Sequence, residues 1–471
     1  MAGKMKKGFA SYLVVLLIAL VAAFLICITV MLFSPFKNIL GFKYFAYTKD
    51  DITPVYNETG SSGNIFDFEK IAEININCSY ADVVIEKTRD VDNHAIKFVN
   101  LTSGFARAND NTDFTYELSF QDASNSILDI NVHEPEGFLY FNKKVQIKVY
   151  VPYTASYILA NTKINVTSTS GDVLIGNKTK VPNAEINSEI DLNAFSVKTT
   201  SGLVKIYDVI EPNFTEIFVK SNKGNVDLRK DITVSNKLEI YSTSGEVSFS
   251  NVTYSNKSSY ALFDLSKSKF KANTITGSGN VMLSSGYFDV TKIDGSLISS
   301  NAAKQMKSAK LTIGEITGVV SLPFLNGSSI TVNKIQSQAD FYAHSTSGDI
   351  KVLETNGEVY AETTSGDITV NTSATDFDLK TTTGNVYVTY NASSIADQLD
   401  IETTKGSINM KVKSELAFNL AVYDTKNNLR NGGVNITFLQ DKFTNPLKVN
   451  GGSKKLILIS DGTINISLLA E

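Results

Sequence analysis

The segment Phe341–Val352, FYAHSTSGDIKV, is followed by two close copies of itself: Val359–Val370, VYAETTSGDITV, and Phe377–Val388, FDLKTTTGNVYV. Each copy alternates apolar and polar residues, passes through several Ser or Thr residues to a Gly, and then alternates again. Alternation with a period of two is typical of a β-strand with one buried face. Each copy is therefore expected to form two short strands that meet at a tight corner.

The Gly in each copy is expected to form that corner. Gly384, for example, provides either the positive φ or the close approach of two backbones that a tight corner needs. Ser, Thr, Asp and Asn side chains beside it can bond the exposed backbone groups of the turn.

The same phrase recurs along most of the chain. Further copies are Ile164–Ile175, Phe195–Ile206, Ile217–Leu228, Leu238–Phe249, Leu399–Met410 and, in last place, Leu456–Ile466. Their glycines Gly171, Gly202, Gly224 and Gly245 are 31, 22 and 21 residues apart, and Gly348, Gly366, Gly384 and Gly406 are 18, 18 and 22 apart. In the less regular stretch between these blocks, the expected corner glycines are Gly279, Gly295 and Gly318.

A repeat of about twenty residues cannot bury its apolar face alone, so successive units must stack. The sequence therefore predicts an all-β protein built as a parallel β-solenoid, similar to a β-helix. About fourteen rungs spaced about 4.8 Å apart would make a rod roughly 65 Å long that stands clear of a membrane. A sandwich of antiparallel hairpins is the alternative that the local pattern also permits.

The residues before the regular repeats alternate as well, but they lack the Gly phrase. The strand Val145–Pro152, VQIKVYVP, ends at a proline, which cannot donate to a β-ladder. Because the terminal repeats of a solenoid must shield its open edge, this segment is expected to be an N-terminal β cap. The predicted boundaries are residues 64–160 for the cap and 161–471 for the solenoid.

An apolar run precedes the β-rich part. Phe9–Phe33 contains 25 residues without a charge, which make a helix of about 37 Å, long enough to cross a bilayer. Lys4, Lys6 and Lys7 precede it and favour a cytoplasmic N-terminus with the C-terminal part outside. A cleaved signal peptide is the alternative, although its apolar region is usually shorter. The predicted order is residues 1–8 in the cytoplasm, 9–33 across the membrane and 34–63 as a juxtamembrane linker.

Charge and cysteine content narrow the function classes. The net charge is −4, with basic residues gathered near the start, so the outer part is weakly acidic and offers no basic stripe for nucleic acid. Cys27 lies inside the apolar run and Cys78 outside it, so a disulfide between them is not expected. A lone Cys78 is more typical of a small buried side chain than of a bridge between two copies.

Carboxylates recur at the position after the corner glycine. Asp172, Glu246, Asp349 and Asp367 occupy it, and stacking would line some of them up as a Ca²⁺ or sugar site. The same position holds Leu203, Asn225, Asn385 and Ser407 in other copies, which favours a turn residue that caps backbone amides. The three histidines, His94, His133 and His344, have no Cys at zinc-ligand spacing. No catalytic, cofactor-binding or metal-binding residue is predicted.

The iterated SGDV, SGDI, SGEV and TGNV phrases, after an opening ADVVIE and the VQIKVYVP strand, resemble a bacterial β-strand-repeat family of unknown function that carries an adhesin label. The resemblance covers Ile65 to Leu468 and implies a β-solenoid-like fold in a cell-envelope setting. We therefore expect a non-catalytic, membrane-anchored extracytoplasmic binding module. Its expected partners are the lipid bilayer and surface glycans or envelope proteins. The alternatives are a carbohydrate-active β-helix enzyme, such as a polysaccharide lyase or hydrolase, and an envelope-stress sensor.

Overall fold

The structure is a computed structural model of the whole chain. It describes the following residues: 12, 14–26, 29, 38–39, 42–52, 71–88, 96–121, 126–152, 162–176, 194–207, 213–228, 231–254, 260–283, 286–298, 306–372, 376–395, 397–439 and 443–470.

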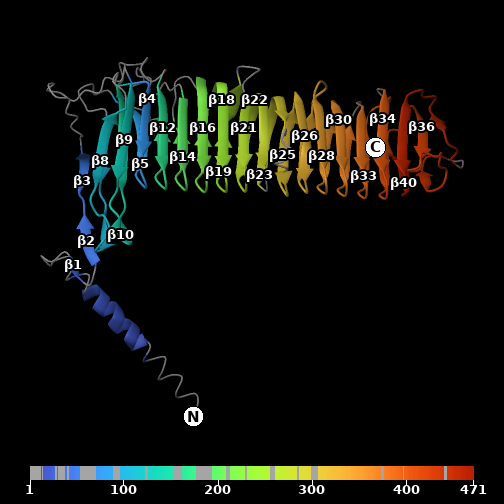
Figure 1. Cartoon of the computed structure of the whole chain (residues 1–471). Coiled ribbons are helices and arrows are strands. Elements are labelled where there is room, and N and C mark those ends of the chain that lie inside the picture. Colours follow the sequence, from blue (N-terminus) through green and yellow to red (C-terminus); the bar gives the residue numbers. More distant parts are fainter. Residues whose placement is uncertain are drawn as a thin grey trace, which may run out of the picture.

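Most of the described residues form a long rod of stacked strands (Figure 1). Two parallel ladders run along it, and we call face A the ladder of strands that precede the corner and face B the ladder of strands that follow it. In spatial order, face A contains β9 (Ile127–His133), β4 (Glu73–Asn77), β12 (Lys163–Ser168), β14 (Ala194–Thr199), β16 (Asn213–Ser221), β18 (Ile232–Ser242), β21 (Tyr260–Leu265), β22 (Lys269–Leu283), β23 (Tyr287–Ile298), β26 (Val319–Asn326), β28 (Asp340–Ser345), β30 (Glu358–Thr363), β32 (Phe377–Thr381), β34 (Gln398–Thr403), β39 (Lys455–Ser460) and β36 (Phe418–Tyr423).

Face B follows the same order. It contains β11 (Val145–Pro152), β5 (Asp82–Thr88), β13 (Val173–Ile175), β15 (Val204–Ile206), β17 (Val226–Leu228), β19 (Glu246–Phe249), the first parts of β22 and β23, β25 (Lys310–Ile316), β27 (Ser329–Ile335), β29 (Ile350–Thr355), β31 (Ile368–Thr372), β33 (Val386–Tyr390), β35 (Ile408–Val412), β40 (Ile464–Leu468) and β37 (Val434–Ile436). In the middle of the rod, β22 and β23 cross from face B through a short third side to face A, so that only their last parts lie on face A. The third side also includes β20 (Asn251–Tyr254).

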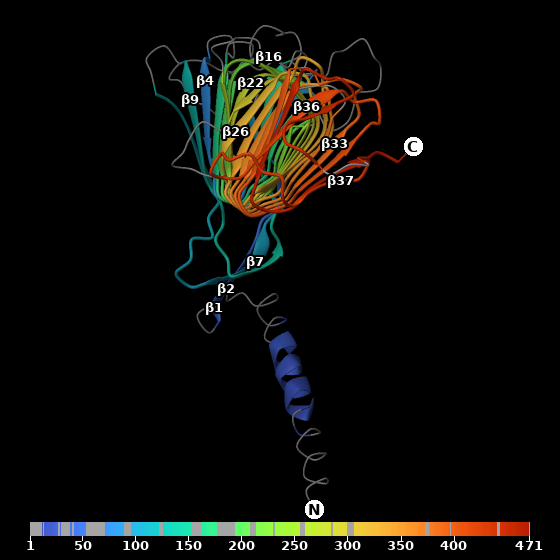
Figure 2. The same cartoon turned by 90° about the vertical axis from the view of Figure 1, so that its right-hand side faces the viewer.

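The core runs as one column between the two faces. Equivalent apolar residues stack in register, so that Phe341, Val359 and Phe377 succeed one another along face A and are all buried. Rings stack in the same way on face B, where the centroids of Phe270 and Phe288 lie 4.9 Å apart. Seen along the rod, the strands enclose a wedge-shaped interior (Figure 2). The prediction of a mostly β protein with a long parallel sheet is therefore confirmed, and the antiparallel sandwich is not observed.

The corner glycines are required by close contact and not by unusual torsion angles. A Cβ placed on Gly384 would lie 1.9 Å from the carbonyl oxygen of Gly366, and one on Gly406 would lie 1.8 Å from that of Gly384. Neither glycine has a positive φ. Of the two reasons that the sequence left open for these glycines, the close approach of backbones is the one that applies.

A buried hydroxyl three residues before Gly384 and Gly406 holds each of these corners. The Thr381 Oγ1 accepts a hydrogen bond from the amide of Gly384 at 3.1 Å and donates one to the carbonyl of Gly366 at 3.2 Å. The same pair of bonds recurs at Thr403. One hydroxyl therefore satisfies the turn of its own rung and ties it to the rung below.

Chain order and spatial order differ at both ends of the rod. The last strands in the sequence, β39 and β40, lie inside the stack between β34 and β35 on one side and β36 and β37 on the other. At the other end, β9 and β11 lie outside β4 and β5, although they follow them in the sequence. Each end is covered by antiparallel strands: β8 (Thr115–Phe120), β6 (Ile96–Asn100) and β3 (Lys49–Ile52) at one end, and β38 (Leu447–Val449) at the other.

Several boundaries differ from the sequence-based ones. Strands β4, β5, β9 and β11 belong to the expected cap but stack as full rungs, because their alternating faces match the repeats in register. The expected linker contains β3 and two strands, Asn38–Ile39 and Phe42–Ala46, of a separate four-stranded sheet. Gly279 lies within β22 opposite Ala261, so it is not a corner residue. Gly295 and Gly318 do stack, on Gly277 and Gly295 respectively, but at a second corner of the rung.

The separate sheet consists of β1 (Asn38–Ile39), β2 (Phe42–Ala46), β7 (Ser103–Arg107) and β10 (Leu139–Asn142). Strand β24 (Met306–Lys307) completes the described strands and pairs with β26. Before the sheet, residues 12, 14–26 and 29 are helical, and the rest of the predicted segment 9–33 lies outside the described residues. Within the described part of the chain, no helix is both long and apolar enough to cross a membrane.

Candidate binding surface

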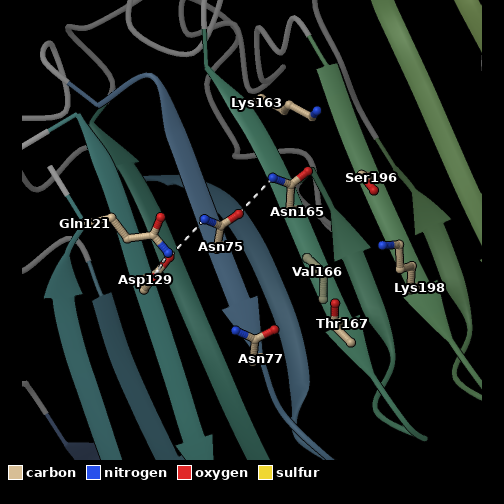
Figure 3. Close-up of a pocket in the computed structure, with 10 residues that line it drawn as sticks. All are labelled: Asn75, Asn77, Gln121, Asp129, Lys163, Asn165, Val166, Thr167, Ser196 and Lys198. Carbon is tan, nitrogen blue, oxygen red and sulfur yellow. Dashed lines mark hydrogen bonds between the residues drawn. The ribbon is translucent and has the colours of Figure 1, made fainter.

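A polar groove lies on the outside of face A near the N-terminal end of the rod. It has a volume of about 390 Å³ and is open to solvent (Figure 3). Strands β9, β4, β12 and β14 provide most of its lining. The lining residues are Asn75, Asn77, Gln121, Asp129, Lys163, Asn165, Val166, Thr167, Ser196 and Lys198.

A ladder of two side-chain amides that ends on a carboxylate crosses the groove, and we call it the amide ladder. Asn165, Asn75 and Asp129 are in register on three neighbouring strands, so their side chains stack at the strand spacing. The Asn165 Nδ2 donates to the Asn75 Oδ1 at 2.8 Å, and the Asn75 Nδ2 donates to the Asp129 Oδ1 at 2.9 Å. Gln121 donates to the other oxygen of Asp129. These bonds fix the orientation of each amide before any ligand arrives.

Two neighbouring contacts extend the ladder. The Asn165 Nδ2 also donates to the Glu73 Oε1 at 2.7 Å, and Asn77 donates to Asn131 at 2.9 Å. The next residue in register after Asn165 is Ser196, whose side chain is too short to continue the chain of amides. Lys163 and Lys198 stand beside this end of the ladder (Figure 3). The groove therefore combines oriented amides and the Asp129 carboxylate with hydroxyls and ammonium groups.

This surface suits a polar ligand with many hydroxyl groups. Amide groups can both donate and accept hydrogen bonds, and the lysines add donors that favour negatively charged or oxygen-rich groups. Val166 is the apolar residue in the lining. The groove is open and mostly polar, unlike the deep apolar pockets that bind drug-sized molecules.

The carboxylates singled out by the repeat act within the turns. The Asp349 Oδ1 accepts the backbone amide of Asp367 at 2.9 Å, and the Asp367 Oδ1 accepts that of Asn385 at 2.7 Å. Asp172 does the same for Leu203 at 2.9 Å. These side chains do form a ladder along the rod, and each of them is bonded to the backbone of the next turn.

Glu246 differs from the other three. Its carboxylate lies 3.5 Å from the Lys271 Nζ and accepts a hydrogen bond from Ser248 at 3.3 Å. These residues line a second open hollow of about 310 Å³ on face B, together with Asp289. An ion pair of this kind at an exposed position contributes little to stability.

The histidines and the cysteine outside the apolar run occupy unrelated places. His344 is on face A in register with Glu362, and His133 is the last residue of β9, the outermost strand of face A. His94 lies outside the described residues. Cys27 also lies outside them. Cys78 is largely buried, and burial raises the pKa of its thiol to about 12, so the reactive thiolate is scarce at neutral pH. The described residues contain no group of three His, Cys, Asp or Glu side chains placed to hold a metal ion.

Sequence reasoning missed the amide ladder. Its signal is present as outward-facing Asn residues at the same strand position in Ile74-Asn75-Ile76 and Ile164-Asn165-Val166. These segments are about ninety residues apart, and only the stacking of β12 on β4 brings them together. Asp129 adds a third strand that comes from the excursion at the end of the rod.

Comparison with known proteins gives one match. A family model described as Toastrack DUF4097, a domain of unknown function, matches residues 71–467. No curated protein and no solved structure matches the chain. The resemblance seen in the repeated phrases is thereby confirmed.

Proposed function

This chain belongs to the toastrack DUF4097 family, and from that premise we propose that it is a non-catalytic binding module, with adhesin-like contacts to surface glycans or envelope proteins. The observation that carries the proposal is the pre-oriented amide ladder of Asn165, Asn75 and Asp129. Because these amides are already held by one another, they lose little conformational entropy when a ligand binds.

We further propose that the chain is anchored in a membrane by its N-terminal segment, with the solenoid on the extracytoplasmic side. The uncharged run Phe9–Phe33 supports this proposal, as do the apolar side chains that residues 14–26 expose along the described helix. Carbonate extraction of membranes that contain the full chain tests the anchor. Retention in the membrane pellet is expected, and release into the supernatant would contradict the anchor.

A binding screen tests the module. The full chain in lipid nanodiscs is presented to arrays of glycans and to isolated envelope proteins, and the best ligand is then titrated against two variants. Asn165→Ala removes both the NH2 donor and the carbonyl acceptor of this side chain from the ladder. It should weaken binding about tenfold, which corresponds to a loss of about 1.4 kcal/mol in the free energy of binding. Asn409→Ala is the matched control, since Asn409 forms a similar amide pair with Asn465 at 2.9 Å on the far end of face B.

The two variants separate the possible outcomes. Selective loss in Asn165→Ala supports the groove as the binding surface. Equal affinity in both variants would move the binding site away from the groove, and the absence of any ligand would contradict the binding proposal. Incubation with acidic polysaccharides tests the non-catalytic part, because release of shortened chains would establish an enzyme.

A further inference from the structure

The small sheet of β1, β2, β7 and β10 has two different faces. On one face, the buried Phe45 of β2 packs against Tyr140 of β10, with ring centroids 6.1 Å apart. Tyr140 in turn contacts Tyr80, at the first corner, at 6.0 Å. The Glu134 carboxylate strengthens this attachment because its Oε1 accepts the backbone amides of residues 79–81, each at 2.8 Å. The small sheet is therefore fixed to the corner side of the first rungs.

The other face of the small sheet carries apolar side chains into solvent. We call Phe42, Phe138, Leu139 and Phe141 the aromatic patch; they are 38%, 52%, 37% and 51% exposed. Phe42 and Phe138 lie 5.1 Å apart between ring centroids, and Phe141 lies 5.3 Å from the buried Phe105. Outside the N-terminal helix, the exposed phenylalanines of the described residues are all in this patch. Gathered exposed rings of this kind mark a surface that binds something apolar.

The position of the aromatic patch identifies its occupant. Both views place the small sheet between the N-terminal helix and the solenoid (Figure 1 and Figure 2). Only residues 34–41 separate the end of the apolar run from Phe42, so the patch can lie no more than about 30 Å from that end. Aromatic side chains are enriched at the level of lipid headgroups, where their rings are partly buried. A bilayer that holds the helix would therefore lie within reach of the patch.

We propose that the aromatic patch inserts into the headgroup region of the same phospholipid bilayer that holds the N-terminal segment. This inference rests on the proposed anchor. The small sheet is attached to the corner side of the first rungs, and the long axis of the rod runs roughly perpendicular to the direction in which the sheet projects (Figure 1). Insertion of the patch therefore lays the solenoid along the membrane surface, in contrast to a rod that stands clear of it.

The absence of tryptophan from the chain makes a direct test available. The full-length variants Phe141→Trp and Leu429→Trp are each reconstituted in phospholipid vesicles with and without brominated acyl chains, which quench tryptophan on contact. Leu429 is 56% exposed and lies at the far end of the rod, so it is the matched control. We expect brominated lipid to remove most of the Phe141→Trp emission, which should also be shifted to the blue, and to leave that of Leu429→Trp unchanged.

Retention of each variant in carbonate-washed vesicles separates the two proposals. If the protein is retained but Phe141→Trp is quenched no more than Leu429→Trp, the anchor holds and the inserted patch is overturned. If the protein is released, both are overturned. Phe138→Trp provides a second reporter on the same patch, should Phe141→Trp fail to give the circular dichroism spectrum of the unaltered chain.

Discussion

At the scale of single residues, the repeat is held by contacts that leave no space for a side chain. Most corner glycines lie directly on the carbonyl of the glycine one rung below, as Gly384 does on Gly366, and at Thr381 one buried hydroxyl bonds both glycines. The sequence pattern of a Ser or Thr followed three residues later by a Gly therefore corresponds to one hydrogen-bonded corner. This explains why the polar residues before the glycine persist although they are buried.

The first prediction concerns a corner glycine. Gly384→Ala would place a Cβ 1.9 Å from the carbonyl oxygen of Gly366, and backbone must move to relieve that contact. We expect the free energy of unfolding to fall by about 3 kcal/mol, the upper end for overpacking in a core. Chemical denaturation measures the change. Gly432→Ala is the control, because a Cβ added at Gly432 would have no atom within 4 Å, and an equal loss in both variants would contradict this explanation.

The second prediction concerns the pH dependence of stability. Asp378 lies on the outward face of β32, where partial desolvation by its neighbours first, and the charge of Asp400 second, raise its pKa above the ordinary value. The folded state therefore binds this proton more tightly than the unfolded state, so the ionised carboxylate lowers stability at neutral pH and this penalty fades on acidification. Asp378→Asn should raise the melting temperature at pH 7, which corresponds to a gain of less than about 1 kcal/mol in the free energy of unfolding. At acidic pH the substitution should have no effect.

Asp397→Asn provides the comparison of opposite sign. A hydrogen bond from Lys454 lowers the pKa of Asp397, so its charge favours the folded state above that pKa. Thermal melts at pH 7 should therefore show a decrease for Asp397→Asn and an increase for Asp378→Asn. If the melting temperatures of both variants shifted in the same direction, the two carboxylates would not have opposite effects on stability, and the prediction would be wrong.

At the scale of elements, the strands and corners could be predicted from the sequence, but their order in space could not. Alternation and the corner glycine are local signals, and FDLKTTTGNVYV contains all of them. The insertion of β39 and β40 between β34 and β36 has no local signal, because every rung presents the same alternating edge. The amide ladder of the groove was missed for the same reason, since Asn75 and Asn165 meet only through stacking.

The third prediction follows from that insertion. Deletion of residues 455–471 removes an inner rung, including the buried Leu456, Leu458, Ile464 and Ile466, each worth about 1.5–3 kcal/mol when buried. Strands β36 and β37 then lose their parallel partners. We expect rapid proteolysis of residues 413–452 and a lower melting temperature. Deletion of residues 470–471 alone, beyond the end of β40, should leave both unchanged.

If the longer deletion resisted protease as well as the full chain does, β36 would have to pair directly with β34. Mass spectrometry of the protease fragments distinguishes these cases, because cleavage confined to residues 413–452 reports release of the outer rung only. Cleavage throughout the repeats would instead show that the whole rod depends on its final strands.

At the scale of the whole molecule, the rod is a sum of similar rungs in contact with their neighbours. Solenoids of this kind have stabilities that approximate the sum of rung and interface contributions. Parallel pairs connect each rung only with the next, and the antiparallel pairs are confined to the two ends and the small sheet. The length of the rod is therefore adjustable in a way that its ends are not.

The last prediction tests this modular character. Deletion of residues 367–384 removes one full rung and joins Gly366 to Asn385, so that β30 comes next to β34 and β29 next to β33 with the register preserved. We expect a folded protein with an unchanged circular dichroism shape and a single, slightly lower melting transition. Deletion of residues 367–375, half as long, removes β31 and puts β32, a face A strand, into the face B position after the corner. This change should abolish the cooperative transition. A cooperative melt in the half-rung variant, or its loss in the full-rung variant, would mean that stability does not reside in the register between neighbouring rungs.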